Sequence, residues 1–219
     1  MRIVVAAEYP IIAEAVKLGC RDDSNLEVVG SASTGRNAIE LFKQLNPDVG
    51  ILDLSLPDLD GFQVIDIVRQ QRLPPLFLAI SMRCDPYIVR KVEISGFHGF
   101  IDLRTVIFTE LRKIIATIGR RDASFPPAFV SVLSCHQRDP LAFDKILSNR
   151  QQMILALIGD LMTDIEIADS LNMTPCAIER QRHRIMDKLE LSSRLDLVRY
   201  ARREGLFGIF GPRWLRLAT

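Results

Sequence analysis

The chain has 219 residues, which is enough for two modest domains that each bury a core. Its formal net charge of +1 excludes a global basic field, and its four scattered cysteines lack metal-ligand spacing and do not suggest a disulfide framework. No apolar run approaches a membrane span and no signal peptide is recognisable, so we expect a cytoplasmic protein with no membrane partner.

The first half of the chain alternates between two kinds of pattern. Apolar runs predict strands at 3–6, 28–31, 49–52, 76–81 and 100–101. Helical periodicity lies between and after them, at 11–20, 36–45, 62–71, 87–94 and 106–118. This alternation predicts an α/β domain over 1–118, with a doubly wound five-stranded parallel sheet whose functional groups gather at the carboxyl ends of the strands.

The second half of the chain changes character. Residues 119–146 contain several prolines and are expected to be a linker. From 147 to 206 the pattern is helical throughout, with Ser148 and Thr174 placed as capping residues and Pro175 at a first helical position. We therefore predict an all-α four-helix domain over 147–206, followed by an apolar C-terminal tail over 207–219.

The segment DLSLPDLDG places Asp53 at the end of the third strand, before a turn that leads into a helix. Together with the strand pattern, this block resembles the receiver domain of two-component response regulators, which has a flavodoxin-like fold. The resemblance implies that Asp53 accepts a phosphoryl group from a histidine kinase. It also implies that Ser81 binds the phosphoryl oxygens and that Phe100 is the aromatic residue that rearranges with the switch.

Two groups that a receiver normally uses are missing. The acidic pair after the first strand reads Ala7-Glu8, and Leu103 stands where a lysine is usual. Phosphorylation adds a charge of about −2, which a lysine and Mg²⁺ would neutralise. We therefore predict an atypical, degenerate receiver in which Asp53 is phosphoacceptor-like but unused. No cofactor is expected, and weak Mg²⁺ binding at Glu8 and Asp53 matters only if phosphorylation occurs.

Residues 147–206 resemble the LuxR-type helix-turn-helix domain of the NarL/FixJ subfamily. The matching segments are LSNRQQMILALI, TDIEIADSLNMTPCAIERQRHRIMDKLEL and SSRLDLVRYA. The resemblance implies a recognition helix over 174–188 that enters the major groove of double-stranded DNA. The residues that it places at DNA are Thr174, Glu179, Arg180, Arg182, His183, Arg184, Lys188 and Arg194.

This helix departs from the family pattern at two positions. Glu179 stands where a basic residue usually contacts DNA; a carboxylate can accept a hydrogen bond from cytosine but repels phosphate. Arg182 stands where an apolar residue usually packs, and its stem can pack while its charged head reaches solvent or phosphate. Both changes are expected to alter the base contacts that the family makes.

These patterns support three hypotheses. The first is a homodimeric DNA-binding transcription regulator whose receiver works without phosphorylation, with a protein partner or a small ligand as its input. The second is a conventional response regulator phosphorylated on Asp53. The third is an interaction protein that sequesters another regulator. No nucleophile–base constellation or nucleotide-binding glycine loop is present in the sequence, so we expect no enzyme.

Overall fold

A computed structural model describes residues 1–21, 23–70 and 75–208 of the protein. The chain divides into two compact units, one built mainly from residues 1–131 and the other mainly from residues 132 onward. None of the helices in the described ranges is long and apolar enough to cross a membrane.

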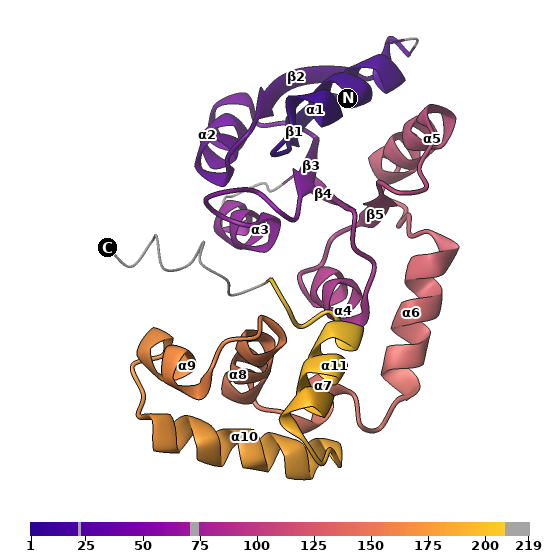
Figure 1. Cartoon of the computed structure of the whole chain (residues 1–219). Coiled ribbons are helices and arrows are strands. Elements are labelled where there is room, and N and C mark those ends of the chain that lie inside the picture. The colour runs from indigo at the N-terminus through magenta and orange to yellow at the C-terminus, as the bar shows by residue number, and fades with distance from the viewer. Residues whose placement is uncertain (22, 71–74, 209–219) are drawn as a thin grey trace. The chain divides into compact units, whose positions relative to one another are not determined.

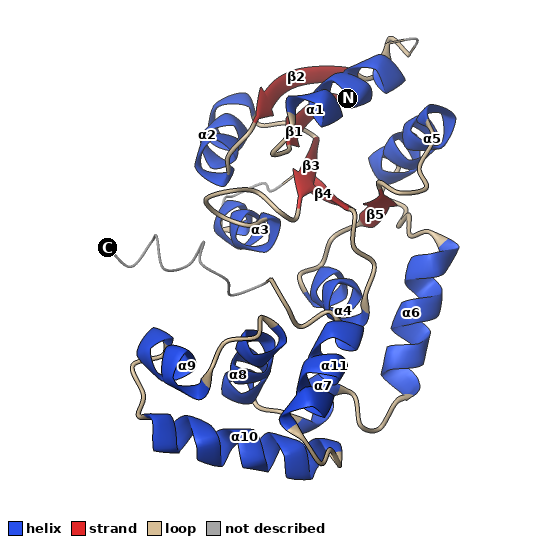
Figure 2. Cartoon of the chain, viewed as in Figure 1, coloured by secondary structure: helices blue, strands red, loops and turns tan. Residues whose placement is uncertain are grey.

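The first unit contains the expected parallel sheet, with strand order β2-β1-β3-β4-β5 (Figures 1 and 2). The strands are β1 (Arg2–Ala6), β2 (Glu27–Ala32), β3 (Val49–Asp53), β4 (Leu76–Ser81) and β5 (Gly99–Asp102). The helices that follow them are α1 (Pro10–Cys20), α2 (Gly35–Leu45), α3 (Gly61–Arg69), α4 (Pro86–Ile94) and α5 (Phe108–Gly119). This doubly wound arrangement confirms the predicted fold class, and the predicted element boundaries differ from the observed ones by only a few residues.

Two separate apolar layers hold the helices on the sheet. On one face, Val16 of α1 and Ile115 of α5 pack in one buried cluster with strand residues such as Ile51 and Ile101. On the other face, the ring of Phe42 from α2 meets that of Phe77 from β4 edge to face at 5.6 Å. Strand residues alternate between these layers because successive side chains point to opposite faces.

Gly50 makes the aromatic packing on the second face sterically feasible. A Cβ atom at this position would lie 2.7 Å from the Phe42 ring and 2.9 Å from the Phe77 ring. Both distances are shorter than a van der Waals contact, so any larger residue would force the two rings apart. The glycine in the otherwise apolar third strand therefore serves packing rather than a turn.

Residues 119–146, which the sequence predicts as a linker, contain regular structure. Helix α6 (Pro127–Arg138) and the short helix α7 (Phe143–Ile146) lie within this segment. Before α6, Ser124 forms a parallel bridge with Gly99, accepting from the Phe100 N–H at 3.0 Å and donating its own N–H to the His98 carbonyl at 3.0 Å. The first half of the segment therefore extends the edge of the sheet beside β5 and belongs to the first unit, because backbone groups at that edge need partners.

The second unit contains four main helices, α8 (Asn149–Gly159), α9 (Asp164–Ser170), α10 (Pro175–Leu189) and α11 (Arg194–Glu204), in agreement with the predicted four-helix domain. Ser148 and Gln151 form a capping box at α8, and Thr174 caps α10 with Pro175 at its first position, as expected. The helices bury an apolar core that includes Ile154, Ile167, Ile178 and Leu197. Of the tail predicted over 207–219, residues 209–219 lie outside the described residues.

Candidate phosphoacceptor pocket and nucleic-acid interface

Asp53 and Ser81 lie at the carboxyl ends of two neighbouring strands. Asp53, which is 6% exposed, ends β3 and pairs in register with Ile80, the residue before Ser81. Its Oδ1 accepts a hydrogen bond from the Ser55 N–H at 2.8 Å. Ser81 is 3% exposed, and its Oγ accepts from the Arg83 N–H at 2.9 Å. The parallel register therefore brings together the two residues that the sequence assigned to phosphoryl binding.

The other two carboxylates of DLSLPDLDG have structural roles. Asp58 accepts hydrogen bonds from the N–H groups of Gly35 (2.5 Å) and Arg36 (3.0 Å) at the start of α2. Burial opposes ionisation of Asp58, but these backbone hydrogen bonds outweigh it and lower its pKa. Asp60 caps α3 in a capping box with Gln63, and burial raises its pKa. The motif thus anchors two helix starts around Asp53.

The residues after β1 are poorly suited to Mg²⁺. Ala7 is buried in the core and offers only a methyl group at the first position of the acidic pair, while Glu8, at the second position, is half-buried. Mg²⁺ favours octahedral oxygen ligands, and the donor set is one carboxylate short of the usual arrangement. Within the described ranges, no group of three or more His, Cys, Asp or Glu side chains is placed to hold a metal ion.

Position 103, where the lysine is missing, joins the apolar core. The Leu103 N–H donates to the Ser81 carbonyl at 3.0 Å, and its side chain packs against the cluster between α1 and α5. The neighbouring Arg104 does not take over the lysine's position. Its Nε and Nη2 bind the two carboxylate oxygens of Asp102 at 2.9 and 2.6 Å. These hydrogen bonds lower the pKa of Asp102, and the cation that follows position 103 in the chain forms a bidentate pair with it.

Phe100, the switch aromatic implied by the sequence, is fully buried in the first unit. Its ring centroid lies 5.1 Å from that of Phe129 in α6, and Phe129 in turn stacks on Phe125 at 4.7 Å. The residue that a receiver uses to change its surface is therefore covered by the segment that leads toward the second unit. The sequence predicts only a linker here and gives no sign of this aromatic contact.

The candidate nucleic-acid interface begins at the amino end of α10. The Thr174 side chain accepts a hydrogen bond from the Ala177 N–H at 3.3 Å, and Thr174 itself is exposed. Arg180 and Arg184 are exposed along the helix that follows. Exposed Glu179 lies 4.0 Å from His183 Nε2, one helical turn away. These residues present a mainly basic helix surface that carries one carboxylate.

Arg182 and Arg194 converge on a residue that sequence reasoning missed. Arg182 Nε lies 3.1 Å from Asp164 Oδ2, and Arg194 Nη1 lies 2.5 Å from Asp164 Oδ1. Arg194 also donates to the Met162 carbonyl. Burial opposes ionisation of Asp164, but the two guanidinium groups outweigh it and lower its pKa. The triad joins α9, α10 and α11. The sequence signal was the arginine itself, because a charged residue at a packing position requires a partner.

Lys188 is exposed but also engaged in internal hydrogen bonds. Its Nζ donates to the Ile146 carbonyl at 2.8 Å and to Gln151 Oε1 at 2.9 Å. These bonds join the carboxyl end of α10 to the start of α8. The eight residues that the sequence placed at DNA therefore fall into two groups. Arg182, Arg194 and Lys188 hold helices together, while Thr174, Glu179, Arg180, His183 and Arg184 form the exposed helix surface.

Comparisons with known proteins agree with this architecture. A family model described as the response regulator receiver domain matches residues 3–115, and one described as bacterial regulatory proteins of the luxR family matches residues 145–201. The probable transcriptional regulatory protein NarL of Mycobacterium tuberculosis is 31% identical over 207 residues, covering 94% of this chain and 95% of that protein.

Solved structures share the fold. The receiver domain of the putative response regulator NarL from Mycobacterium tuberculosis is 35% identical, with a TM-score of 0.51, and covers 54% of this chain and 95% of that one. RcsB from Salmonella enterica serovar Typhimurium, solved bound to a promoter, has a TM-score of 0.65 at 24% identity and covers 91% of this chain and 97% of that one.

A receiver sheet joined to a four-helix helix-turn-helix domain defines a response regulator with a DNA-binding output domain. The chain belongs to this family, and its DNA-binding domain is of the luxR type. It is accordingly a DNA-binding transcription regulator of the response-regulator type.

Proposed function

We propose that the protein binds double-stranded DNA as a homodimer and regulates transcription without phosphorylation of Asp53. The observation that carries the proposal is the chemistry at the end of β5. Leu103 packs into the apolar core at the lysine position, and Arg104 is held by Asp102 through two hydrogen bonds. A phosphoryl group on Asp53 would lack the cation that normally neutralises it, and Ala7 removes one of the carboxylates that would hold Mg²⁺.

The exposed basic surface of α10 supports the proposed DNA binding. Arg180 and Arg184 are exposed on α10, where a helix in the major groove would present them to base edges or phosphates. Relatives with the same fold include RcsB, described as two dimers bound to two DNAs. Within the proposal, Thr174, His183 and Glu179 complete the contact surface. Arg182, Arg194 and Lys188 act by positioning the helices.

The test uses full-length protein purified without a phosphodonor. Genomic DNA fragments that the wild-type protein retains are sequenced, and the affinity for the recovered site is measured in gel shifts. The proposal expects equal affinity and equal occupancy for wild type and for Asp53→Ala, in the test tube and in genome-wide mapping. Loss of DNA binding in the absence of a phosphodonor, or in Asp53→Ala, would contradict it.

A conventional phosphorylation switch is the second candidate. It is supported by the adjacent, buried placement of Asp53 and Ser81 at the ends of β3 and β4. Beryllofluoride with Mg²⁺ mimics an aspartyl phosphate, and its effect on the dimer is read by sedimentation. A response that disappears in Asp53→Ala would favour this candidate, whereas an identical sedimentation profile with and without the mimic favours a phosphorylation-independent receiver.

A further inference from the structure

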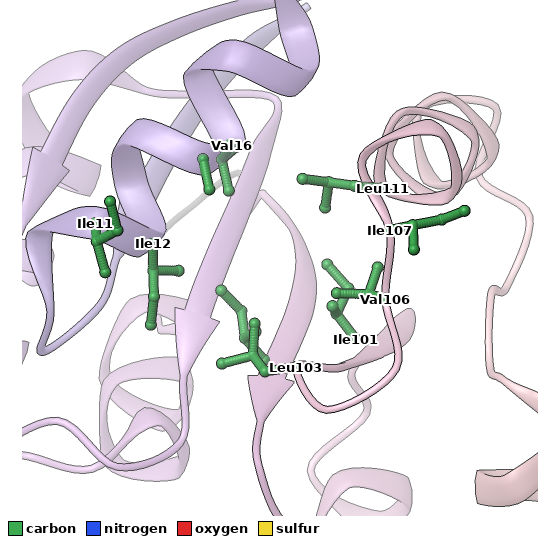
Figure 3. Close-up of a pocket in the computed structure, with 10 residues that line it drawn as sticks. Ile11, Ile12, Val16, Ile101, Leu103, Val106, Ile107 and Leu111 are labelled. Atoms are coloured by element: carbon green, nitrogen blue, oxygen red, sulfur yellow. The ribbon is translucent and has the colours of Figure 1, made fainter.

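The first unit contains an apolar pocket beside the degenerate phosphoacceptor site. It has a volume of about 360 Å³ and is enclosed by α1, the ends of β4 and β5, the loop after β5 and the start of α5. Figure 3 shows α1 side chains on one side and those of the loop and α5 on the other. We propose that this pocket binds a small, neutral, apolar molecule and that this molecule is the input to the receiver. The proposal rests on the phosphorylation-independent function above and deepens it.

The lining sets the chemistry of the ligand. All ten lining residues are apolar, and none carries a titratable group: Ile11, Ile12, Ala15, Val16, Ile80, Ile101, Leu103, Val106, Ile107 and Leu111. Burying a charge against such walls is costly, so the pocket selects against ions and phosphorylated molecules. Leu103 contributes to this property, because its apolar side chain forms part of the lining at the position where a receiver usually has a lysine.

The size of the pocket sets the size of the ligand. Small-molecule sites in proteins usually enclose about 300–1,000 Å³, and this pocket lies within that range. An apolar cavity of about 150 Å³ remains dry and binds benzene, so the volume here admits a molecule roughly twice as large. A neutral ligand with two fused rings, or a branched aliphatic chain of similar volume, fits this description.

The depth of the pocket favours a small molecule over a second copy of the chain. Its lining extends to Ile80 and Ile101, which are almost fully buried in the strands beneath the helices. Ile11 and Ile107, in contrast, are 72% and 59% exposed. A flat partner surface across α1 and α5 would cover these two exposed side chains without reaching the strands, whereas a small ligand that enters the pocket contacts Ile80 and Ile101.

The pocket also has a physical route to the rest of the chain. Leu103 is joined to β4 through its hydrogen bond to the Ser81 carbonyl, and it follows the strand that carries Phe100. Phe100 packs on Phe129 of α6, the helix that leads toward the second unit. A ligand that shifts the end of β5 therefore acts on the contact that holds α6. An apolar ligand as the input would thus explain both the leucine at the lysine position and the apolar lining of the pocket.

The test uses naphthalene as a probe with full-length protein labelled at isoleucine δ1 methyl groups. Five isoleucines line the pocket, and the ring current of a bound aromatic molecule shifts their methyl resonances. The proposal expects saturable shifts at those five, with little change at Ile154 in the core of the second unit. Naphthalenesulfonate, which has the same rings and a negative charge, is expected to bind about tenfold more weakly or worse.

Two pairs of variants locate the site. Ala15→Phe fills the pocket from α1, while Ala128→Phe adds the same ring at an exposed position on α6. Leu103→Lys removes an apolar lining side chain and adds a charge, while Leu103→Met keeps its volume and apolar character. The first member of each pair is expected to weaken naphthalene binding about tenfold or more, and the second to change it less than about threefold. Circular dichroism melts verify that every variant is folded.

Several outcomes would overturn the proposal. One is the absence of saturable shifts in folded wild-type protein, and another is equal binding by Ala15→Phe and Ala128→Phe. A third is a dimer, detected by sedimentation, whose formation at higher protein concentration displaces naphthalene from the wild-type protein, because a second copy would then be the occupant. Probe binding is measured without DNA. A failure here is therefore distinguishable from a failure of the proposed function, which is read from DNA affinity alone.

Discussion

The proposed division of α10 into residues that contact DNA and residues that position helices makes Arg180→Ala and Arg182→Ala an informative pair. The two residues lie two positions apart on the same helix and carry the same charge, so a purely electrostatic model of DNA binding treats them alike. Arg180 is exposed, whereas the side chain of Arg182 is 16% exposed and bound to Asp164. Comparing affinity and stability in both variants tests whether this difference is functional.

The structure assigns a different loss to each variant. Arg180→Ala removes an exposed side chain that the proposed function places at the DNA; loss of such a contact typically costs about 1–3 kcal/mol of binding, and the change in stability should be less than about 0.5 kcal/mol. Arg182→Ala removes one charge-assisted hydrogen bond of 3.1 Å. Because Arg194 still pairs with Asp164, the expected loss of stability is about 1.5 kcal/mol, near the lower end for such bonds. Asp164→Ala leaves both guanidinium groups without the carboxylate and should cost about 3 kcal/mol, the upper end for hydrogen bonds to charged groups.

The assays are urea unfolding of the full chain and gel-shift titrations at several salt concentrations, performed under conditions where each variant is folded. If Arg180 contacts a phosphate, the slope of log affinity against log salt falls by about one in Arg180→Ala, whereas it is unchanged in Arg182→Ala. The reasoning is refuted if Arg182→Ala has wild-type stability and lowers the salt slope as much as Arg180→Ala does, since Arg182 would then face DNA and not Asp164.

Three further predictions concern stability, each measured by denaturant unfolding of the full chain. Phe129→Ala empties the contact with the β5 aromatic and should cost about 3 kcal/mol, whereas Val130→Ala, at a half-exposed neighbouring position, should cost less than about 1 kcal/mol. Burial, together with the charge of Arg69, lowers the pKa of His98 from its ordinary value of 6.5. The neutral ring is therefore favoured in the folded state, and the contribution of His98 to the free energy of unfolding is complete above pH 6.5 and declines as the pH falls below that value. His98→Asn keeps an acceptor and should remove that decline. Lys188→Met should cost about 1 kcal/mol through its lost internal hydrogen bonds and leave the salt slope of DNA binding unchanged.

Each of these three has a contradicting result. Equal stability losses in Phe129→Ala and Val130→Ala would mean that α6 does not depend on the β5 contact. An identical decline from pH 7 to pH 5 in wild type and His98→Asn would exclude His98 as its source. A lower salt slope in Lys188→Met would move Lys188 from the positioning group to the contact group.

Local sequence patterns were sufficient for the secondary structure and for the two domains. Alternating apolar runs and helical periods determine strands and helices through their different repeats, and the caps at Ser148 and Thr174 mark helix starts because their hydroxyls satisfy backbone N–H groups. The same patterns failed for residues 119–146. A segment rich in proline has no periodicity that reveals a partner, and its regular structure depends on β5 through Ser124 and Phe129.

For the candidate sites, too, the sequence determined which residues are present and the tertiary structure determined what they contact. The sequence alone showed that the lysine and one acid of a receiver are absent, because identity at a motif position requires no coordinates. Only the tertiary structure showed what surrounds the residue at the lysine position. Leu103 lines a pocket with residues of α1, which lie about ninety positions earlier in the chain, and with residues of the loop and helix that follow it. Likewise, the sequence identified a row of basic residues on α10. The packing of α9 and α11 against that helix then determined that Arg182 pairs with Asp164 while Arg180 remains exposed.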